Sequence, residues 1–273
     1  MSLGLSILSW RGAETLESSL ESYAAENLFS AFTDAQIFLP DPDKAVLNVA
    51  KQFAVKVKTL PHNLGIMENM VASAEAMSTD YILMLENDCP LIEPMSEVRR
   101  QLTKSLELLK RDTVIMSRLR SVREPGQAFS GLTKYRKLND GTVRSRLIKN
   151  LRPDKLLRLT GYALYDGPDS VGWHPEHFED VGQGFYLVGA SVMPWTNQSI
   201  LVNRRVFLDK IIPLARSFKT RRHANNLPNL EIELNKSPRW RNKGAPHWRN
   251  SGWKIACGPG LFTHERIGDR GYN

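Results

Sequence analysis

The 273-residue sequence contains only two cysteines, Cys89 and Cys257. Two thiols cannot build the dense disulfide framework of small secreted domains, and they suit a reducing compartment. Long apolar runs are also missing. Even the stretch 199–215 is interrupted by four charged residues, so no window reaches the roughly 18 apolar residues that a membrane span requires. The first ten residues, MSLGLSILSW, are expected to form a strand and give no indication of secretion.

Positive charge is present in excess and is unevenly placed. The sequence has 37 Lys and Arg against 29 Asp and Glu, which gives a formal net charge of +8. The segment 117–158 contains twelve basic and three acidic residues and therefore carries +9, which leaves the rest of the chain at −1. Such a segment faces either an anionic partner or solvent.

Apolar runs alternate with helical patterns through the first half of the chain. Strands are expected at 3–9, 35–39, 54–59, 81–86 and 113–117, with helices at 14–29, 44–53, 66–77 and 96–110. Strands separated by helices of this length predict right-handed crossovers, hence a Rossmann-type α/β fold with a mostly parallel sheet and helices on both faces. Sheets of this kind bind ligands beyond the carboxyl ends of their strands.

Polar side chains follow several of these expected strands. The stretch YILMLENDCP begins as a buried strand and ends in Glu86 and Asp88, while Trp10 follows the first strand and Asp41 the second. The carboxyl ends of parallel strands share one edge of the sheet, so these side chains should lie near one another. Two carboxylates at positions i and i+2 can hold a divalent cation that bridges a diphosphate. The alternative is an ordinary solvated turn.

The order of these features resembles the GT-A-fold glycosyltransferases that use nucleotide-sugars, especially their large inverting family. That family's first strand and helix resemble LSILSWRGAETLESSLESY, and its second strand resembles AQIFLPDPD. Its Asn-x-Gly turn, helix and strand before the DxD motif are similar to HNLGIMENMVASAEAMSTDYILMLENDCP, with Glu86 in place of the first Asp. Its acidic helix, Gly-aromatic-x-Ile strand and metal-binding His resemble NLEIELNKSPRWRNKGAPHWRNSGWKIACGPGLFTH.

The resemblance implies one GT-A-like catalytic domain over 1–273. A nucleotide-sugar-binding half would occupy 1–117, a variable basic insertion on the acceptor side 118–197, and a return to the core 198–273. The implied activity is metal-dependent transfer of a sugar, with inversion, from a UDP- or GDP-linked donor to an acceptor hydroxyl. The acceptor would be a glycan, a glycolipid or a protein, and an anionic one would suit the basic insertion. The enzyme would lie in the cytoplasm, either free or at the surface of a membrane.

The resemblance also implies specific site residues. A Mn²⁺ or Mg²⁺ ion would be held by Glu86, Asp88 and His264. The nucleotide would meet a second set of residues: Trp10, Asp41, Asn63, Gly65, Glu86, and Arg266 or Arg270 near the β-phosphate. Asn63 and Gly65 are expected to form a tight turn. Each of these residues also has an ordinary structural explanation, which for Trp10 is core packing and for His264 a structural role.

The catalytic base is expected in LPNLEIELNKSP, where Glu231 and Glu233 compete. The flanking Pro228 and Pro238 predict a short helix between them. The three leucines at 227, 230 and 234 would form an i, i+3, i+7 stripe, and Glu231 occupies the missing i+4 position of that stripe. We therefore predict that Glu231 faces inward and takes the proton of the acceptor hydroxyl, with Glu233 well off the stripe. The resemblance implies the same residue, because the family's catalytic acid is at the first acidic position of this helix. That position is Glu231 in this sequence, where the family usually has Asp.

Other hypotheses stay open. Glu179 and Asp180 are reserve candidates for the base. Three tryptophans near the C-terminus are interleaved with cations and would suit a nucleic-acid surface, although no recognised binding motif accompanies them, so nucleic acid is the less favoured partner: Trp240, Trp248 and Trp253, with Arg239, Arg241, Lys243 and Arg249. A non-catalytic relative that only binds nucleotide-sugars is the third possibility.

Overall fold

The computed structural model describes residues 2–127, 129–217, 227–235 and 247–268. Within these ranges the chain forms a sheet of nine strands in the order β3-β2-β1-β4-β8-β5-β9-β7-β6. The strands are β1 (Leu3–Leu8), β2 (Asp34–Pro40), β3 (Lys56–Leu60), β4 (Tyr81–Glu86), β5 (Val114–Arg120), β6 (Phe178–Asp180), β7 (Tyr186–Gly189), β8 (Ile200–Asn203) and β9 (Lys254–Phe262).

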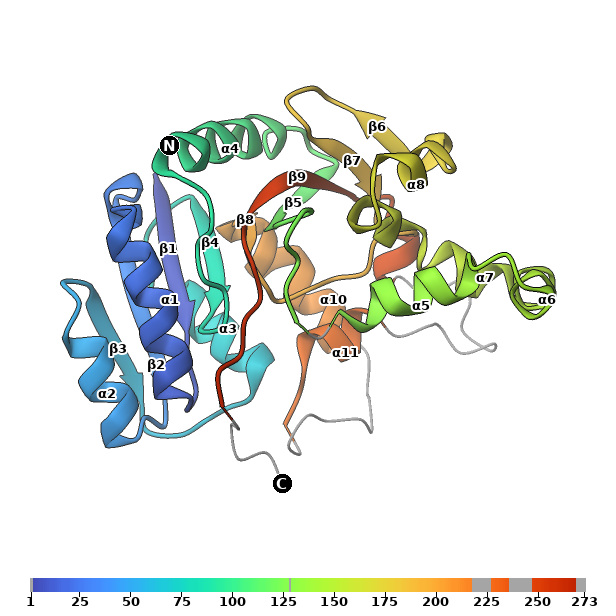
Figure 1. The fold of residues 1–273 in the computed structure, drawn as a ribbon. Helices are drawn as coiled ribbons and strands as arrows, with labels where there is room; N and C mark the ends of the chain where they lie inside the picture. The colour runs from blue at the N-terminus through green and yellow to red at the C-terminus, as the bar shows by residue number, and fades with distance from the viewer. Residues whose placement is uncertain (1, 128, 218–226, 236–246, 269–273) are drawn as a thin grey trace.

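Helices connect and cover these strands (Figure 1). The α-helices are α1 (Ala13–Ala25), α2 (Lys44–Lys51), α3 (Ile66–Glu75), α4 (Met95–Leu108), α5 (Ser130–Leu138), α6 (Val143–Leu151), α7 (Pro153–Leu157), α8 (Pro168–Gly172), α9 (Arg204–Val206), α10 (Ile212–Arg216) and α11 (Leu230–Leu234). Shorter helical turns are η1 (Leu28–Ala31), η2 (Thr160–Tyr165), η3 (Pro175–His177), η4 (Phe207–Ile211) and η6 (Trp248–Asn250). No described helix is long and apolar enough to cross a membrane.

The sheet is mostly parallel with helices on both faces, so the predicted α/β class is confirmed. Strands β1 to β4 pair in parallel, as do β5 and β9, whereas β8 runs antiparallel between β4 and β5. Leu8 of β1 lies opposite Glu86 of β4 and Phe38 of β2, so these three strands end together. The predicted ligand-binding edge therefore exists, because the residues that follow β1, β2 and β4 emerge side by side.

Two apolar cores lie on the two faces of the sheet. In β4, Leu83 and Leu85 belong to the core that α1, α2 and α4 complete, while Ile82 and Met84 belong to the core that α3, α10 and α11 complete. Successive side chains of a strand point to opposite faces, so a strand covered on both sides is apolar at every position. This is why YILML reads as a continuous apolar run.

Strand β5 extends farther than the sequence pattern predicts. The expected strand ends at 117, but β5 continues to Arg120, and both Arg118 (2% exposed) and Arg120 (4% exposed) are buried. The prediction that Arg118 and Arg120 belong to the basic insertion 118–197 is therefore wrong for both residues, because they complete a buried strand. Pairing with β8 and β9 on either side keeps the strand extended beyond its apolar part.

Candidate active site

The segment after β9 runs along the residues that follow β4. The backbone N–H of Thr263 donates to the Pro90 carbonyl at 3.1 Å, and that of Glu265 donates to the Asp88 carbonyl at 3.0 Å. Figure 1 shows this segment passing beside β4 on its way to the C-terminus. These backbone contacts bring His264 and Arg266 next to Asp88, although they are 176 and 178 residues away from it in the sequence.

The Asp88 carboxylate is the centre of this contact. Its Oδ2 atom lies 3.1 Å from His264 Nε2 and accepts a hydrogen bond of 3.1 Å from Arg266 Nη2. Asp88 is 0% exposed and His264 is 2% exposed, whereas the Arg266 side chain is 39% exposed. Two of the three predicted metal ligands, together with the predicted phosphate-binding Arg266, therefore meet at one carboxylate oxygen.

The orientation of His264 determines what its second nitrogen can do. Nδ1 lies 2.9 Å from the Gln127 carbonyl oxygen, which can only accept, so Nδ1 carries a hydrogen. The lone pair of a neutral imidazole is then on Nε2 and points at Asp88 Oδ2. Two acceptor atoms 3.1 Å apart repel unless a proton or another cation lies between them. The pair is therefore a site for a positive charge.

A divalent ion fits the donor atoms of this pair. An octahedral ion with ligands at about 2.1 Å separates adjacent ligands by about 3 Å, which matches the distance between Oδ2 and Nε2. The contact of Nδ1 with a backbone carbonyl is the usual support of a metal-binding histidine. The Arg266 guanidinium shares Oδ2, so an incoming ion would displace it.

Glu86, the third predicted ligand, does not join this pair. It ends β4 and is half-buried. In the described part of the chain, no group of three or more His, Cys, Asp or Glu side chains is placed to hold a metal ion. A metal ion at Asp88 and His264 would therefore need further oxygen ligands from the nucleotide or from water. The role of Glu86 stays a prediction.

The loop 125–127, which contacts His264, is held in place by the buried side chain of Arg120. Arg120 donates to the carbonyls of Pro125 at 2.6 Å and Gln127 at 3.0 Å, and burial lowers the pKa of its guanidinium. Gly126 in this loop has a φ of 73°, and a Cβ atom there would lie 2.2 Å from the His264 carbonyl oxygen. Sequence reasoning missed Arg120 because arginines after an apolar strand look like the start of a surface insertion.

Asn87 ties the ends of β1 and β4 together. Its Nδ2 donates to Ser9 Oγ and to the Arg11 carbonyl, both at 3.1 Å. This contact holds the turn that carries Trp10, which is half-buried with the Arg11 guanidinium 4.7 Å from its ring centre. Trp10 therefore lies at the predicted edge, next to a cation. The sequence interpretation gives Asn87 no role, because the two neighbouring acids, Glu86 and Asp88, carry the metal hypothesis. A side-chain amide at a strand end can nevertheless donate to loop carbonyls.

The residues expected at the nucleoside lie at the same edge or in an adjoining turn. Asp41 is exposed directly after β2, with a left-handed φ of 48°. Asn63 Oδ1 accepts from the Gly65 backbone at 2.9 Å and from Asn69 Nδ2 at 2.7 Å, so the predicted tight turn is confirmed. Gly65 has a φ of 86°, and a Cβ atom there would lie 2.6 Å from Leu227 Cβ. The close approach that requires glycine is thus to the segment before α11.

Helix α11 places the two glutamates differently from the prediction. Asn229 caps the helix by accepting from the backbone of Glu231 at 2.9 Å, so Leu227 precedes the helix and cannot extend its apolar stripe. Leu230 and Leu234 remain as the buried pair, and Glu233 lies on their side at 3% exposed. Glu231 is only half-buried. The prediction that Glu231 is the inward-facing glutamate and Glu233 the outward one is therefore wrong.

Glu231 is nevertheless held in a defined place. Its Oε1 accepts from the backbone N–H of Asn197 at 3.0 Å. It also interacts electrostatically with Tyr162 and with Arg118, which is buried beside the ring of Tyr165 at 5.3 Å. Burial raises the pKa of Tyr165 to about 12, so that ring stays neutral near the guanidinium. Arg118 is thus a second cation of the segment 117–158 that is buried in the core.

A cavity of 590 Å³ lies at the C-terminal end of α11, where Asn235 lines it. Four cations line it, together with Tyr162, Pro194 and Asn235: Lys134, Arg152, Lys155 and Arg158. Asn235 is joined to α11 by a hydrogen bond from its backbone N–H to the Glu231 carbonyl at 3.0 Å. The cavity is therefore basic on the side of the insertion and reaches the helix that carries the candidate base.

The reserve base candidates and the tryptophans of the nucleic-acid hypothesis make other contacts. Glu179, on the edge strand β6, pairs with Lys254 at 2.6 Å and Arg111 at 3.8 Å, and its neighbour Asp180 accepts from the Gly182 backbone at 2.8 Å. Trp248 is 0% exposed and packs against Trp195, so it cannot stack a base. Trp240, Arg239, Arg241, Lys243 and Arg270 lie outside the described residues.

No protein-family model and no curated protein sequence matches the chain. Among solved structures, the chain is similar to glucosyl-3-phosphoglycerate synthase from Mycobacterium tuberculosis in complex with Mn²⁺, UDP-glucose and phosphoglyceric acid. The identity is 13% and the TM-score 0.48, over 98% of this chain and 73% of that chain. The chain is also similar to a mycobacterial protein at 14% identity and a TM-score of 0.46, over 98% of this chain and 68% of that chain.

A third similar structure is that of residues 1–349 of S. aureus TarS in complex with UDP-GlcNAc. The identity is 10% and the TM-score 0.36, over 44% of this chain and 34% of that chain. The similar solved structures thus include glycosyltransferases bound to nucleotide-sugars, which is the class of protein that the sequence resembles. At these identities the likeness concerns the fold alone.

Proposed function

We propose that the protein is a glycosyltransferase that moves a sugar from a UDP- or GDP-linked donor to an acceptor hydroxyl with the help of Mn²⁺ or Mg²⁺. The observation that carries this proposal is the meeting of Asp88, His264 and Arg266 beside the carboxyl end of β4. A carboxylate, an imidazole and a guanidinium at that edge suit a metal-bound diphosphate. Trp10 and Asp41 follow β1 and β2, the two strands that end at the same edge.

Asp88 and His264 would hold the ion, which when bound stabilises the charge that develops on the departing diphosphate. The Gln127 carbonyl keeps the His264 ring in the orientation that this requires. Arg266, once displaced from Asp88, would be free to contact the β-phosphate, because its side chain is 39% exposed. Asn87, which holds the turn of Trp10 through the Arg11 carbonyl, would position that turn for the nucleotide.

Glu231 would take the proton of the acceptor hydroxyl. The Asn197 backbone holds one carboxylate oxygen at 3.0 Å, which leaves Oε2 for the hydroxyl. A general base on the acceptor side suits direct displacement of the diphosphate, and we expect this to invert the configuration of the sugar carbon. Glu233 instead lies on the apolar side of α11 with Leu230 and Leu234, which are both buried.

Donor binding can be tested without knowledge of the acceptor. We expect UDP- or GDP-sugars with Mn²⁺ to raise the unfolding temperature, because a ligand at about 100 times its Kd stabilises a protein by about 2.7 kcal/mol. EDTA should abolish the shift, and slow hydrolysis of the same donor should accompany it. Binding without any turnover would favour the non-catalytic alternative. Failure to bind nucleotides, together with salt-sensitive binding of RNA or DNA, would favour the nucleic-acid alternative.

The cations of the 590 Å³ cavity should serve the acceptor and not the donor. We expect Lys134→Glu combined with Lys155→Glu to raise the KM for a phosphate-bearing acceptor by roughly tenfold or more, because two attractive charges become repulsive. Hydrolysis of the donor and the KM for a neutral acceptor should not change. The matched control is Lys110→Glu, an exposed lysine at the end of α4. An unchanged KM in the double variant would contradict an anionic acceptor at this cavity.

A further inference from the structure

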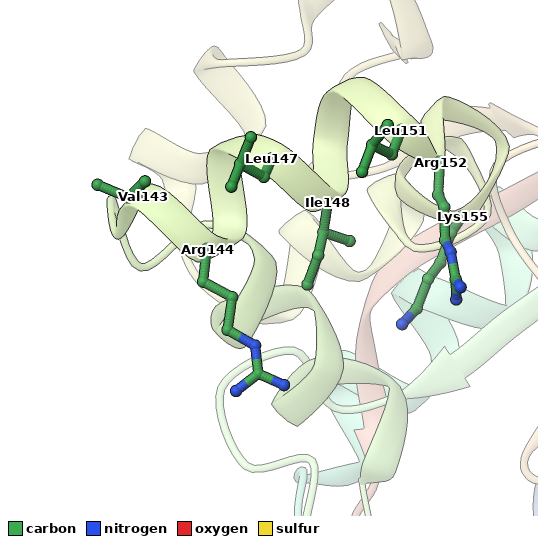
Figure 2. Close-up of a pocket in the computed structure, with 7 residues that line it drawn as sticks. All are labelled: Val143, Arg144, Leu147, Ile148, Leu151, Arg152 and Lys155. Carbon is green, nitrogen blue, oxygen red and sulfur yellow. The ribbon is translucent and has the colours of Figure 1, made fainter.

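Helix α6 exposes an apolar stripe at the outer end of the fold, beyond α5 and α7 (Figure 1). Val143, Leu147 and Leu151 are 73%, 55% and 78% exposed. With 3.6 residues per turn, positions i, i+4 and i+8 lie along one side of a helix. Figure 2 shows the three side chains following one another along α6. Exposed leucines in such a row are unusual on a free surface and mark a binding site.

The stripe faces away from the rest of the protein. Ser145, on the other side of α6, is 3% exposed, and the helix packs against α5 and α7. Thr142 caps the helix by accepting from the Ser145 backbone at 3.1 Å, so α6 is a formed helix with a defined buried side. The apolar row is therefore presented outward on a projecting helix.

Cations surround the stripe almost without acids. Between positions 141 and 158 the sequence contains six Lys or Arg and one acid, Asp154. Arg144 and Arg146 stand on either side of the apolar row by helical geometry, and both are exposed. Arg152 and Lys155 line the same 690 Å³ groove as Val143, Leu147 and Leu151, and Figure 2 shows them beyond Leu151, where α6 ends and α7 begins.

We propose that α6 and the start of α7 dock on the surface of an anionic phospholipid bilayer. Val143, Leu147 and Leu151 enter the boundary between headgroups and acyl chains, and Arg144 and Arg146 meet the lipid phosphates. A helix with an apolar stripe and a basic flank lies in the plane of such an interface. This inference concerns the surface of the insertion and does not depend on the proposed catalytic activity.

Other partners fit the same surface less well. A nucleic acid would pair with the cations but offers no apolar layer for three exposed side chains. A second copy of the chain would bring two strongly basic surfaces together, and like charges oppose that contact. A bilayer offers an apolar layer for the three exposed side chains, and its anionic headgroups complement the charge.

Sedimentation with vesicles tests this directly. We expect the full-length protein to sediment with vesicles that contain about one-third phosphatidylserine but not with phosphatidylcholine alone, and to be released at about 1 M salt. Leu147→Ser with Leu151→Ser should lower the vesicle affinity by about tenfold or more, and Arg144→Glu with Arg146→Glu should do the same. The matched controls are Leu64→Ser, an exposed leucine elsewhere, and Lys58→Glu, an exposed lysine on β3. Both should bind like the parent protein, with unchanged thermal unfolding in all four variants.

A fluorescent label provides a second measurement of membrane contact, one that does not require a variant with lower vesicle affinity. Both native cysteines are buried, Cys89 at 0% and Cys257 at 1% exposed, so a new surface thiol can be labelled selectively. An environment-sensitive dye on Asn150→Cys, beside the stripe, should shift its emission to the blue with anionic vesicles. The same dye on Lys51→Cys, on α2, should not respond.

Three results would overturn the proposal. The first is vesicle affinity that survives the double leucine substitution. The second is equal binding to neutral and anionic vesicles with no response of the dye at position 150. The third is a surface that binds oligonucleotides independently of the leucines but not vesicles, or a dimer that forms without lipid and is lost on Leu147→Ser. Each would assign the surface to another partner.

Discussion

Replacing Glu231 by Gln is expected to lower kcat by at least roughly a hundredfold, the low end of general-base effects, while donor binding is preserved. Gln has the same shape and can still accept the hydrogen bond from the Asn197 backbone at 3.0 Å, so the position of α11 should not change. Only the ability to take a proton is removed. Initial rates of transfer and the Kd for the donor, measured on the same preparation, check this.

Glu233→Gln is the matched control two positions along the same helix. Because Glu233 is 3% exposed, its substitution should affect stability more than turnover. We expect a lower unfolding temperature and a much smaller change in kcat than in Glu231→Gln. The reverse ranking of kcat would move the base to Glu233. Near-normal turnover in both variants would contradict a base on α11 and return attention to Glu179 and Asp180.

Asp88→Asn is expected to abolish metal-dependent nucleotide binding. The substitution removes the negative charge that both His264 Nε2 and Arg266 approach at 3.1 Å, so a divalent ion loses its only charged ligand in this pair. Stability should fall as well, by about 1–3 kcal/mol, because Asp88 is 0% exposed and its buried, charged acceptor is replaced by a neutral amide. Calorimetric titration with Mn²⁺ and UDP measures the binding, and thermal unfolding without metal measures the stability separately.

His264→Ala and Arg266→Gln separate the two contacts of Asp88. His264→Ala should weaken metal binding less than Asp88→Asn, because a neutral ligand contributes less to charge neutralisation than a carboxylate. Arg266→Gln removes the guanidinium that competes for Oδ2, so Mn²⁺ affinity without nucleotide should be retained or increased, while nucleotide affinity falls. If Asp88→Asn bound Mn²⁺ and nucleotide as tightly as the parent, the metal assignment would be wrong.

Local patterns in the sequence were enough to predict the parallel half of the sheet. They also predicted the edge of the sheet at which the polar residues follow the strands. Tyr81–Glu86 could be predicted as a strand because a strand covered on both faces is apolar throughout, and the acids after it mark the place where the chain leaves the core. The Asn63–Gly65 turn was predictable for a similar reason, since an Asn side chain closes such a turn within three residues.

Only the tertiary structure decided which distant groups meet and which charges are buried. Asp88 and His264 are 176 positions apart, and backbone pairing between 88–92 and 261–265 brings them together. Arg118 and Arg120 looked like surface cations until pairing with β8 and β9 buried the whole of β5. The choice between Glu231 and Glu233 depended on where Asn229 caps α11, because Leu227 then lies outside the helix and the buried side is defined by Leu230, Glu233 and Leu234.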